Sequence, residues 1–407
     1  MKLIIHCGRS KTGTSSLQAS LNRGRDILKK YGILYYTGKF SNHNPLAKLV
    51  GKKGRPTEDE SEALLAQAEN LFSEIHDRMS GGRFSHLLLS AEYMENFSAK
   101  QYLRLLDMLG INPDSTAVIM YIRSPHAMYL SRMQQQIKAD HLLLKPKAYR
   151  DDTLECIENW TRTVGAGNLN VRLFSPDRLY GGDIVADFQR VLNEQFDFGL
   201  TGLTSSRENA SLSSESVATL QQYRKICCSA HPRTFLNSSN HLIKTLFEIE
   251  SENQYRFSKP RLKDDVIAEI YKNNAEVVKT LDERYPHLGF SSHCLTDLEH
   301  APSRSPNSHR VVDSQEFADI VKEIDRETLA VLPFVALDRT IKDYLAARKK
   351  SLVLQKLRAQ VNSLQSRLAA VKKEEKGAEQ DMARPKTRGF EKFNSVLRRL
   401  AGKIMGG

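Results

Sequence analysis

The first 200 residues alternate between short apolar runs and amphipathic stretches. Runs such as "HLLLS" and "AVIMYI" are apolar at successive positions, which is typical of parallel strands covered by helices on both faces. The predicted strands are Leu3–Cys7, Ile33–Tyr36, His86–Ser90, Ala117–Ile122 and Asn170–Phe174. The predicted helices between and after them are 14–31, 58–79, 99–110, 126–139, 153–165 and 183–193. This alternation predicts an α/β fold, a three-layer sandwich with a central parallel sheet.

The rest of the chain predicts a C-terminal helical extension. Residues 200–290 are mainly helical in pattern, so we expect a first domain over 1–292 and a linker rich in Ser, Pro and His over 293–312. A helical segment is predicted over 313–345. Within 346–376 apolar residues follow a 3-4-3-4-3 spacing, at Leu354, Leu357, Val361, Leu364, Leu368 and Val371. This repeat predicts either a short coiled coil that forms a homo-oligomer or a helix packed on its own domain.

The net charge of +12 is concentrated at the C-terminal end. Residues 341–407 contain 17 Lys and Arg against 6 Asp and Glu, so residues 1–340 carry a net charge of only +1. This distribution does not indicate a nucleic-acid-binding body. In the segment 384–407, seven basic residues accompany an apolar helical face, formed by Phe390, Phe393, Leu397, Leu400 and Ile404. The segment suits an anionic membrane surface, and a solvated basic tail is the alternative.

The cysteine content and the N-terminal residues indicate a cytoplasmic protein. Five cysteines are few and odd in number, which argues against a disulfide framework and fits a reducing compartment. The N-terminus "MKLIIHCG" has too short an apolar run for a secretory signal, and no later stretch has the length of a membrane span. We therefore expect a cytoplasmic location, peripheral at the inner face of the membrane if the basic tail binds lipid.

The stretch "IIHCGRSKTGTSS" at residues 4–16 predicts an anion-binding site. A strand, a glycine turn and a helix N-terminus bring together free backbone N–H groups and the positive end of a helix dipole. In the P-loop of nucleotide triphosphatases, a lysine directly follows the second glycine. Here Thr14 follows Gly13, and Lys11 lies two residues before that glycine. The spacing disfavours a Walker-type ATPase and predicts that Lys11 reaches the anion from the loop, while the hydroxyls of residues 14–16 cap the helix.

A second anion-binding pattern follows a later predicted strand, in "YIRSPHAMYLSRMQQQIK". Arg123 at the strand end offers a bidentate fork for a phosphate. Pro125 suits the first turn of a helix. Ser131 comes eight residues after the arginine, two turns into that helix. Both side chains bind one ligand only if the ligand lies along the helix and carries two separated anionic groups.

Together these two motifs resemble those of sulfotransferases that use 3′-phosphoadenosine 5′-phosphosulfate. The resemblance is strongest over residues 1–215 and extends to about residue 290, and "LFSPDRLYGGDIVADFQRVL" and "ENASLSSES" are similar to bacterial members that act on carbohydrates. It implies a P-loop NTPase-like sulfotransferase fold. It also implies that Arg123 and Ser131 bind the 3′-phosphate of the donor. The residues that it implies around the 5′-phosphosulfate are Lys11, Thr12, Gly13, Thr14, Ser15 and Ser16.

The chain also departs from that family. Cytosolic members that act on small molecules stack adenine on a tryptophan at the position of Ser16, whereas the single tryptophan here is Trp160, so adenine recognition has no assigned residue. In place of their catalytic histidine stands Glu92, in "HLLLSAEYM", and carbohydrate-directed members include enzymes with a glutamate base. His43, in "FSNHNPLAKL", is the rival base or an acceptor contact. For the family's later basic loop the candidate is Arg207, in "SSRENASL".

The sequence therefore predicts an enzyme that transfers a sulfuryl group to a hydroxyl of a saccharide or glycolipid. Lys11 is expected to stabilise the leaving phosphate and Glu92 to accept the proton of the acceptor. No metal is expected, because the chain has no HExxH motif and no pair of CxxC motifs. Two alternatives are a nucleotide-dependent kinase of P-loop-like fold and a non-catalytic oligomerising scaffold on a degenerate nucleotide-binding fold.

Overall fold

The computed structural model describes residues 1–9, 11–51, 60–112, 116–205, 211–252, 254–290 and 308–381. Contacts between residues divide the chain into two compact units, Met1–Ala336 and Leu337–Gly407. The basic tail predicted at 384–407 lies outside the described residues, and so does Arg207.

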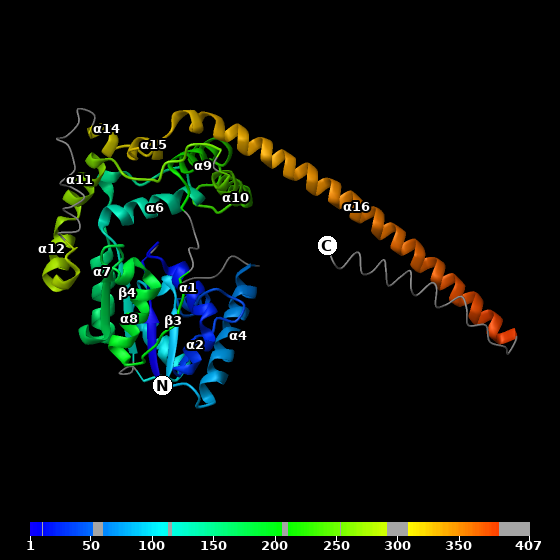
Figure 1. Cartoon of the computed structure of the whole chain (residues 1–407), viewed down its shortest axis with the longest axis horizontal. Helices are drawn as coiled ribbons and strands as arrows, with labels where there is room; N and C mark the ends of the chain where they lie inside the picture. Colours follow the sequence, from blue (N-terminus) through cyan, green and yellow to red (C-terminus); the bar gives the residue numbers. More distant parts are fainter. Residues whose placement is uncertain are drawn as a thin grey trace. The chain divides into compact units, whose positions relative to one another are not determined.

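A parallel sheet forms the centre of the first unit (Figure 1). In the described part of the chain its strands are β1 (Lys2–His6), β2 (Ile33–Leu34), β3 (His86–Ser90), β4 (Thr116–Ile122) and β5 (Leu169–Leu173). Their spatial order is β2-β3-β1-β4-β5, with all neighbours parallel. Ile4 of the central strand β1 is in register with Leu88 on one side and Ala117 on the other. The prediction of an α/β fold with a parallel sheet is confirmed.

Helices connect these strands and continue after the last one. Within the α/β part they are α1 (Thr14–Arg23), α2 (Arg25–Lys30), α3 (Asn44–Val50), α4 (Glu60–Ser80), α5 (Ala99–Leu109), α6 (Pro125–Ala139), α7 (Thr153–Val164) and α8 (Ile184–Phe196). After it come α9 (Ser214–Cys227), α10 (Asn237–Ser251), α11 (Asp264–Asn273), α12 (Ala275–Arg284), α14 (Ser308–Val312), α15 (Phe317–Ile320) and α16 (Arg326–Asp381).

Both faces of the sheet are buried under helices. Successive side chains of a strand point to opposite faces, and here Leu3 and Ile5 belong to one apolar cluster while Ile4 belongs to another. Residues of α1, α2 and α8 pack in the cluster of Ile4, and residues of α4, α5 and α7 pack in the other cluster. The sheet therefore has a helical layer on each face, which explains why its strands are apolar at successive positions.

Two local differences separate the observed helices from the predicted ones. The predicted helix 14–31 is two helices, because Gly24 ends α1 and begins α2. A Cβ at Gly24 would lie 2.4 Å from Leu203 Cδ2, so this position allows a close approach of a distant loop. Helix α3 is absent from the prediction, because its seven residues are too few for an amphipathic repeat to be recognised.

A further group of helices, α6, α9, α10, α11 and α15, gathers beyond the carboxyl ends of the strands, and we call it the terminal helical group (Figure 1). Within this group α9 packs against α6, α10 and α15, and α11 packs against α6. Glu215 of α9 is fully buried, and its carboxylate accepts hydrogen bonds from the backbone N–H groups of Ser258 (2.9 Å) and Asp325 (2.7 Å). One side chain therefore joins α9 to two segments that are far apart in the sequence.

The first unit extends past the predicted domain end at residue 292. Helices α14 and α15 pack against α11 and α9, so the unit ends at Ala336. The predicted linker 293–312 is described only from Ser308, where α14 begins. Packing against a distant helix is a long-range property that local composition does not report.

Helix α16 is continuous where the sequence predicted a division at residue 345. It includes Pro333 near its start and the predicted heptad segment 346–376. Oligomerisation through that segment stays a prediction. Among the described helices, none combines the length and the apolar character that crossing a membrane requires.

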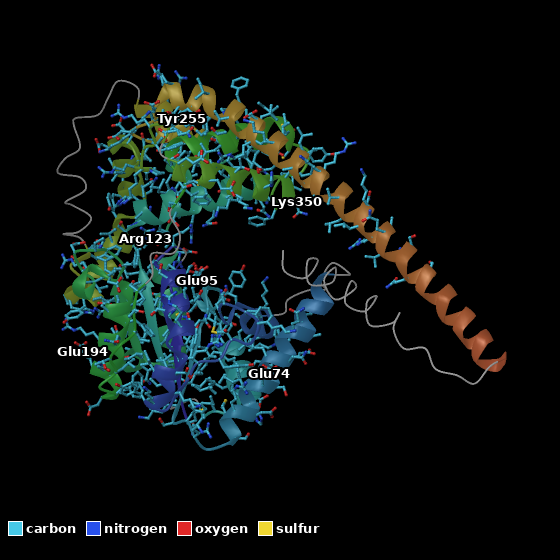
Figure 2. The ribbon with its side chains drawn as sticks, turned by 45° about the vertical axis from the view of Figure 1, so that its right-hand side comes forward. Glu74, Glu95, Arg123, Glu194, Tyr255 and Lys350 are labelled. Carbon is cyan, nitrogen blue, oxygen red and sulfur yellow. The ribbon has the colours of Figure 1, made fainter. Side chains whose placement is uncertain are left out.

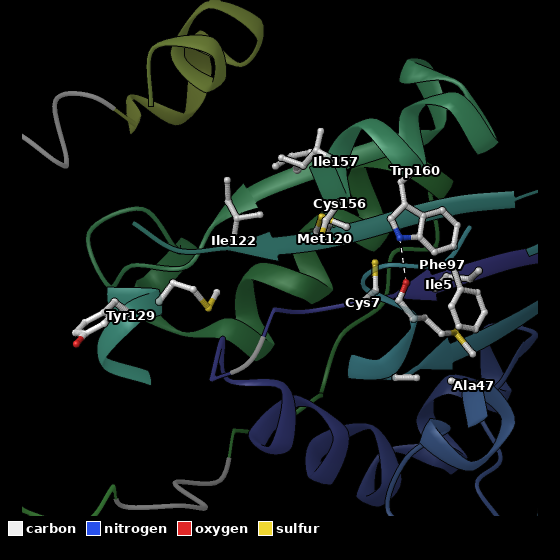
Figure 3. Close-up of a cluster of buried hydrophobic side chains, with 14 of the residues drawn as sticks. Ile5, Cys7, Ala47, Phe97, Met120, Ile122, Tyr129, Cys156, Ile157 and Trp160 are labelled. Atoms are coloured by element: carbon white, nitrogen blue, oxygen red, sulfur yellow. Dashed lines mark hydrogen bonds between the residues drawn. The ribbon is translucent and has the colours of Figure 1, made fainter. Parts of the chain in front are cut away.

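The packing around Trp160 fixes the turn that follows β3 (Figure 3). Trp160 of α7 is fully buried, and its ring stacks on Phe97 and meets the edge of Tyr102 of α5. Its Nε1–H donates to the backbone oxygen of Met94 at 3.1 Å. Because a buried indole N–H needs a partner, this bond ties α7 to the residues directly after β3.

Replacing Trp160 by Phe is expected to lower the free energy of unfolding by about 1–3 kcal/mol, because a buried hydrogen bond and part of the packed ring are lost, and the Met94 oxygen keeps only the Phe97 N–H at 3.3 Å. Urea denaturation followed by circular dichroism measures this change. Tyr180→Phe, at a side chain that is 55% exposed, is the control and should change stability by less than about 0.5 kcal/mol. Equal unfolding midpoints for Trp160→Phe and the control would contradict this account.

Candidate functional site

The loop between β1 and α1 is tightly wound. It first continues beside β4, where the N–H groups of Cys7 and Arg9 donate to the backbone oxygens of Ile119 and Tyr121. Lys11 (φ 64°) and Gly13 (φ 71°) then adopt left-handed conformations that turn the chain into α1. A non-glycine residue in this conformation costs about 1–2 kcal/mol, and such strain is typically kept at functional sites.

Glycine is required at both ends of this loop. A Cβ at Gly8 would lie 2.5 Å from Thr12 Oγ1 and 2.7 Å from Thr14 Oγ1, and a Cβ at Gly13 would lie 2.7 Å from Phe174 Cε2. Gly13 has no side chain to cap α1, and the structure describes no side-chain cap at this helix N-terminus, which carries the positive end of the helix dipole. The loop therefore has the form of an anion cradle.

Arg9 anchors this loop from below. Its side chain is 1% exposed, donates to the Asp152 carboxylate and lies 3.5 Å from Glu95. Burial alone would lower the pKa of Arg9, but Glu95 and Asp152 raise it above its ordinary value. Arg132 of α6 donates to the same Asp152 oxygen at 2.5 Å. The buried cation therefore links the loop to α6 and α7.

One cavity of about 1220 Å³ opens at the carboxyl ends of the central strands. Lys11 follows β1, Glu92 follows β3 in a short 3-10 turn, and Arg123 follows β4. Figure 2 shows Arg123 and Glu95 at this same end of the sheet. Since β1 lies between β3 and β4, the cavity occupies the topological switch point, where ligands bind in open α/β sheets.

Arg123 is a cation without a described anionic partner. Its guanidinium lies 5.3 Å from the centre of the Phe174 ring, and its Nε is buried without a hydrogen bond. Burial lowers the pKa of Arg123 to about 10. In the described ranges no carboxylate forms an ion pair with it. A buried charged group of this kind needs a partner, so Arg123 is suited to bind an anion from solution.

Lys11 and Glu92 both line the cavity, and the charge of each acts on the other. Burial raises the pKa of Glu92, while the Lys11 ammonium and a hydrogen bond from Thr14 oppose the shift. Burial lowers the pKa of Lys11, Glu92 opposes that shift, and Arg123 adds to it. A carboxylate with a raised pKa close to a cation is suited to accept a proton near neutral pH.

Most of the sequence-predicted site residues line this cavity. They are Lys11, Gly13, Thr14, Ser15, Ser16, Glu92, Arg123 and Ser131. Thr12 is not among the lining residues: it is fully buried, and its hydroxyl donates to the Arg9 backbone oxygen at 2.6 Å. Thr12 therefore shapes the loop rather than facing the cavity.

His43 lies apart from the cavity lining. It is fully buried, its Nδ1 accepts from the N–H of Ser90 at 3.0 Å, and its Nε2 donates to the Tyr36 oxygen at 2.9 Å. Burial lowers the pKa of His43 to about 4. One ring nitrogen joins the start of α3 to β3 and the other joins it to the segment after β2, so the geometry argues against its predicted role as a base or an acceptor contact.

Four more basic residues, which were not predicted from the sequence, also line the cavity. Lys138 lies seven residues after Ser131 on α6, so the two residues share one helical face. This spacing is the sequence feature that could have predicted Lys138. Lys259, Arg261 and Lys322 come from the terminal helical group and its connecting segments, and no local pattern connects them to the loop after β1. Within the described ranges, no group of three or more metal-ligating side chains is found.

Comparisons with protein-family models, with curated proteins and with solved structures gave no match to this chain.

Replacing Gly13 by Ala is expected to lower the free energy of unfolding by about 2–4 kcal/mol, because the left-handed strain adds to the contact with Phe174. Gly110→Ala is the matched control: its φ is also positive (62°), but a Cβ there meets nothing within 4 Å. It should cost only the strain, about 1–2 kcal/mol. Urea denaturation compares the two, and equal losses would disprove the close approach at Gly13.

Proposed function

We propose that this protein is a sulfotransferase that uses 3′-phosphoadenosine 5′-phosphosulfate as donor and a saccharide hydroxyl as acceptor, on a P-loop-like α/β core. One observation carries the proposal: Lys11, Glu92 and Arg123, from three adjacent strand ends, line one cavity together with Ser131 of α6. The order of these residues in the chain and their positions after β1, β3 and β4 are those that the resemblance to the family implies.

The residues in the cavity fit a donor with anionic groups at two ends. Gly8, Gly13 and the first turn of α1 suit one phosphate, because glycine allows backbone N–H groups to approach it closely. Arg123 suits the other phosphate, because its buried Nε has no described partner. Ser131 lies two turns into α6 and is 3% exposed, so the ligand would lie along that helix.

The donor, when bound, supplies an activated sulfuryl group. Lys11 is suited to stabilise negative charge at the bridging oxygen of the leaving phosphate, because it lies in the loop that would hold that phosphate. Glu92 is suited to accept the proton of the attacking hydroxyl, because its raised pKa brings it closer to that of an effective base. Phe174 and Leu130 supply apolar surface that excludes water from the same cavity.

The donor site is tested by calorimetric titration with adenosine 3′,5′-bisphosphate. Lys11→Ala and Arg123→Ala should each weaken binding about 10–100-fold, because each removes a charge-assisted hydrogen bond. Lys244→Ala, at a lysine that is 77% exposed and pairs with Glu248, is the control and should bind like the wild type. Absence of binding to the wild type, or equal affinity in all four proteins, would refute the donor site.

Glu92→Gln should separate binding from chemistry. Bisphosphate binding should stay within about twofold, because the substitution keeps the shape of the side chain, while transfer of radiolabelled sulfate to a panel of saccharides should fall about 10²–10⁴-fold. Wild-type activity should fall as the pH decreases through the Glu92 pKa, which lies above its ordinary value. Glu194→Gln, at an exposed ion pair with Arg190, is the control. Unchanged turnover in Glu92→Gln would remove Glu92 as the base.

A further inference from the structure

The cavity has a second set of cations on the side of the terminal helical group. We call Lys259, Arg261 and Lys322 the basic rim; all three are exposed and line the cavity. The acidic lining residue among the described side chains is Glu92. Basic side chains that line one concave surface raise the local positive potential and attract anions.

The basic rim is held in a defined backbone arrangement. Leu262 pairs with Val321 in an antiparallel bridge, and the N–H of Lys322 donates to the Arg261 oxygen at 2.8 Å. The buried Glu215 carboxylate binds the N–H group of Ser258, directly before the rim. Two segments that are distant in sequence are thus fixed side by side, and their basic side chains border the same space.

Two of the three rim cations have no described anionic partner. Lys322 pairs with Asp264 at 2.6 Å. For Lys259 and Arg261, the described residues provide no carboxylate within ion-pair distance. Lys138, which is not part of the rim, also lines the cavity, and the charge of Lys11 acts on it. Like charges gathered in one cavity repel each other, and an anionic ligand relieves that repulsion.

The proposed donor does not account for the rim. Its two anionic ends are assigned to the loop after β1 and to the residues after β4, which belong to the α/β part of the unit. Lys259 and Arg261 lie in the segment before α11. An arginine fork with a neighbouring lysine binds carboxylate or phosphate well, because it offers parallel N–H donors and a point charge.

We propose that the acceptor is an anionic saccharide whose carboxylate or phosphate group is bound by Lys259 and Arg261. The inference rests on the proposed function for the reaction itself and adds the chemical class of the substrate. A neutral sugar would leave the charges of Lys259 and Arg261 without an anionic partner, so we expect it to bind more weakly than an anionic sugar.

The test is a calorimetric titration of the full chain with glucose, glucuronate and glucose 6-phosphate, each with and without saturating adenosine 3′,5′-bisphosphate. At least one anionic sugar should bind the wild type about tenfold or more tighter than glucose, and Lys259→Ala/Arg261→Ala should abolish that preference. The two anionic arms distinguish a carboxylate from a phosphate. Bisphosphate affinity should stay within twofold in the double variant.

Lys244→Ala/Lys279→Ala is the matched control, because it also removes two exposed positive charges. These two lysines lie on α10 and α12 and do not line the cavity. It should keep the preference for anionic sugars, and both double variants should keep the melting temperature of the wild type.

The outcomes separate this inference from the proposed function. Equal or undetectable binding of the three sugars, or an anionic preference that survives in the rim variant, would overturn the inference. A large loss of bisphosphate affinity in the rim variant would also overturn it, because the rim would then belong to the donor. If the wild type does not bind bisphosphate but prefers anionic sugars in a way that depends on Lys259 and Arg261, the proposed donor is wrong. The inference that the rim binds an anionic saccharide is then supported.

Discussion

The parallel pairing of β1 with both β3 and β4 determines where the candidate chemical groups lie. Parallel strands end at the same edge of a sheet, so the residues that follow them, Lys11, Glu92 and Arg123, enter one space although they are far apart in the sequence. If either neighbour ran antiparallel, its following loop would leave at the opposite edge. Segments that adjoin helices of the terminal helical group line the same space with the basic side chains of Lys259, Arg261 and Lys322.

The conformation of the loop that carries Lys11 depends on a buried charge, the guanidinium of Arg9. Arg9 is buried beneath it and is compensated by Asp152 and Glu95. Removing a charge from water is expensive, so such a cation is stable only while its partners stay in position. The same partners therefore hold the loop in a conformation in which the backbone of Lys11 is left-handed. An unconstrained loop would not keep this strained conformation.

The parts of this structure that follow from local sequence were predictable, and those that depend on distant packing were not. β3 has the predicted bounds, because a continuous apolar run between polar segments encodes it. The loop with Lys11 was recognised because its spacing is local. The division of the first helix at Gly24 is not predicted, and the close approach of Leu203 to this position is a distant contact that the local sequence does not report. Lys322 could not be assigned to the cavity, because a bridge to residues sixty positions earlier brings it there.

The single tryptophan of the chain gives the protein an internal optical reporter. Trp160 is hydrogen-bonded to the backbone of Met94, two residues after Glu92, and is fully shielded from solvent. The emission of a buried indole responds to the field and the hydrogen bond around it, and here no second tryptophan adds background. Its fluorescence therefore reports on the turn that carries Glu92. The binding of a ligand that moves this turn can be followed without a label, on the timescale of a stopped-flow experiment.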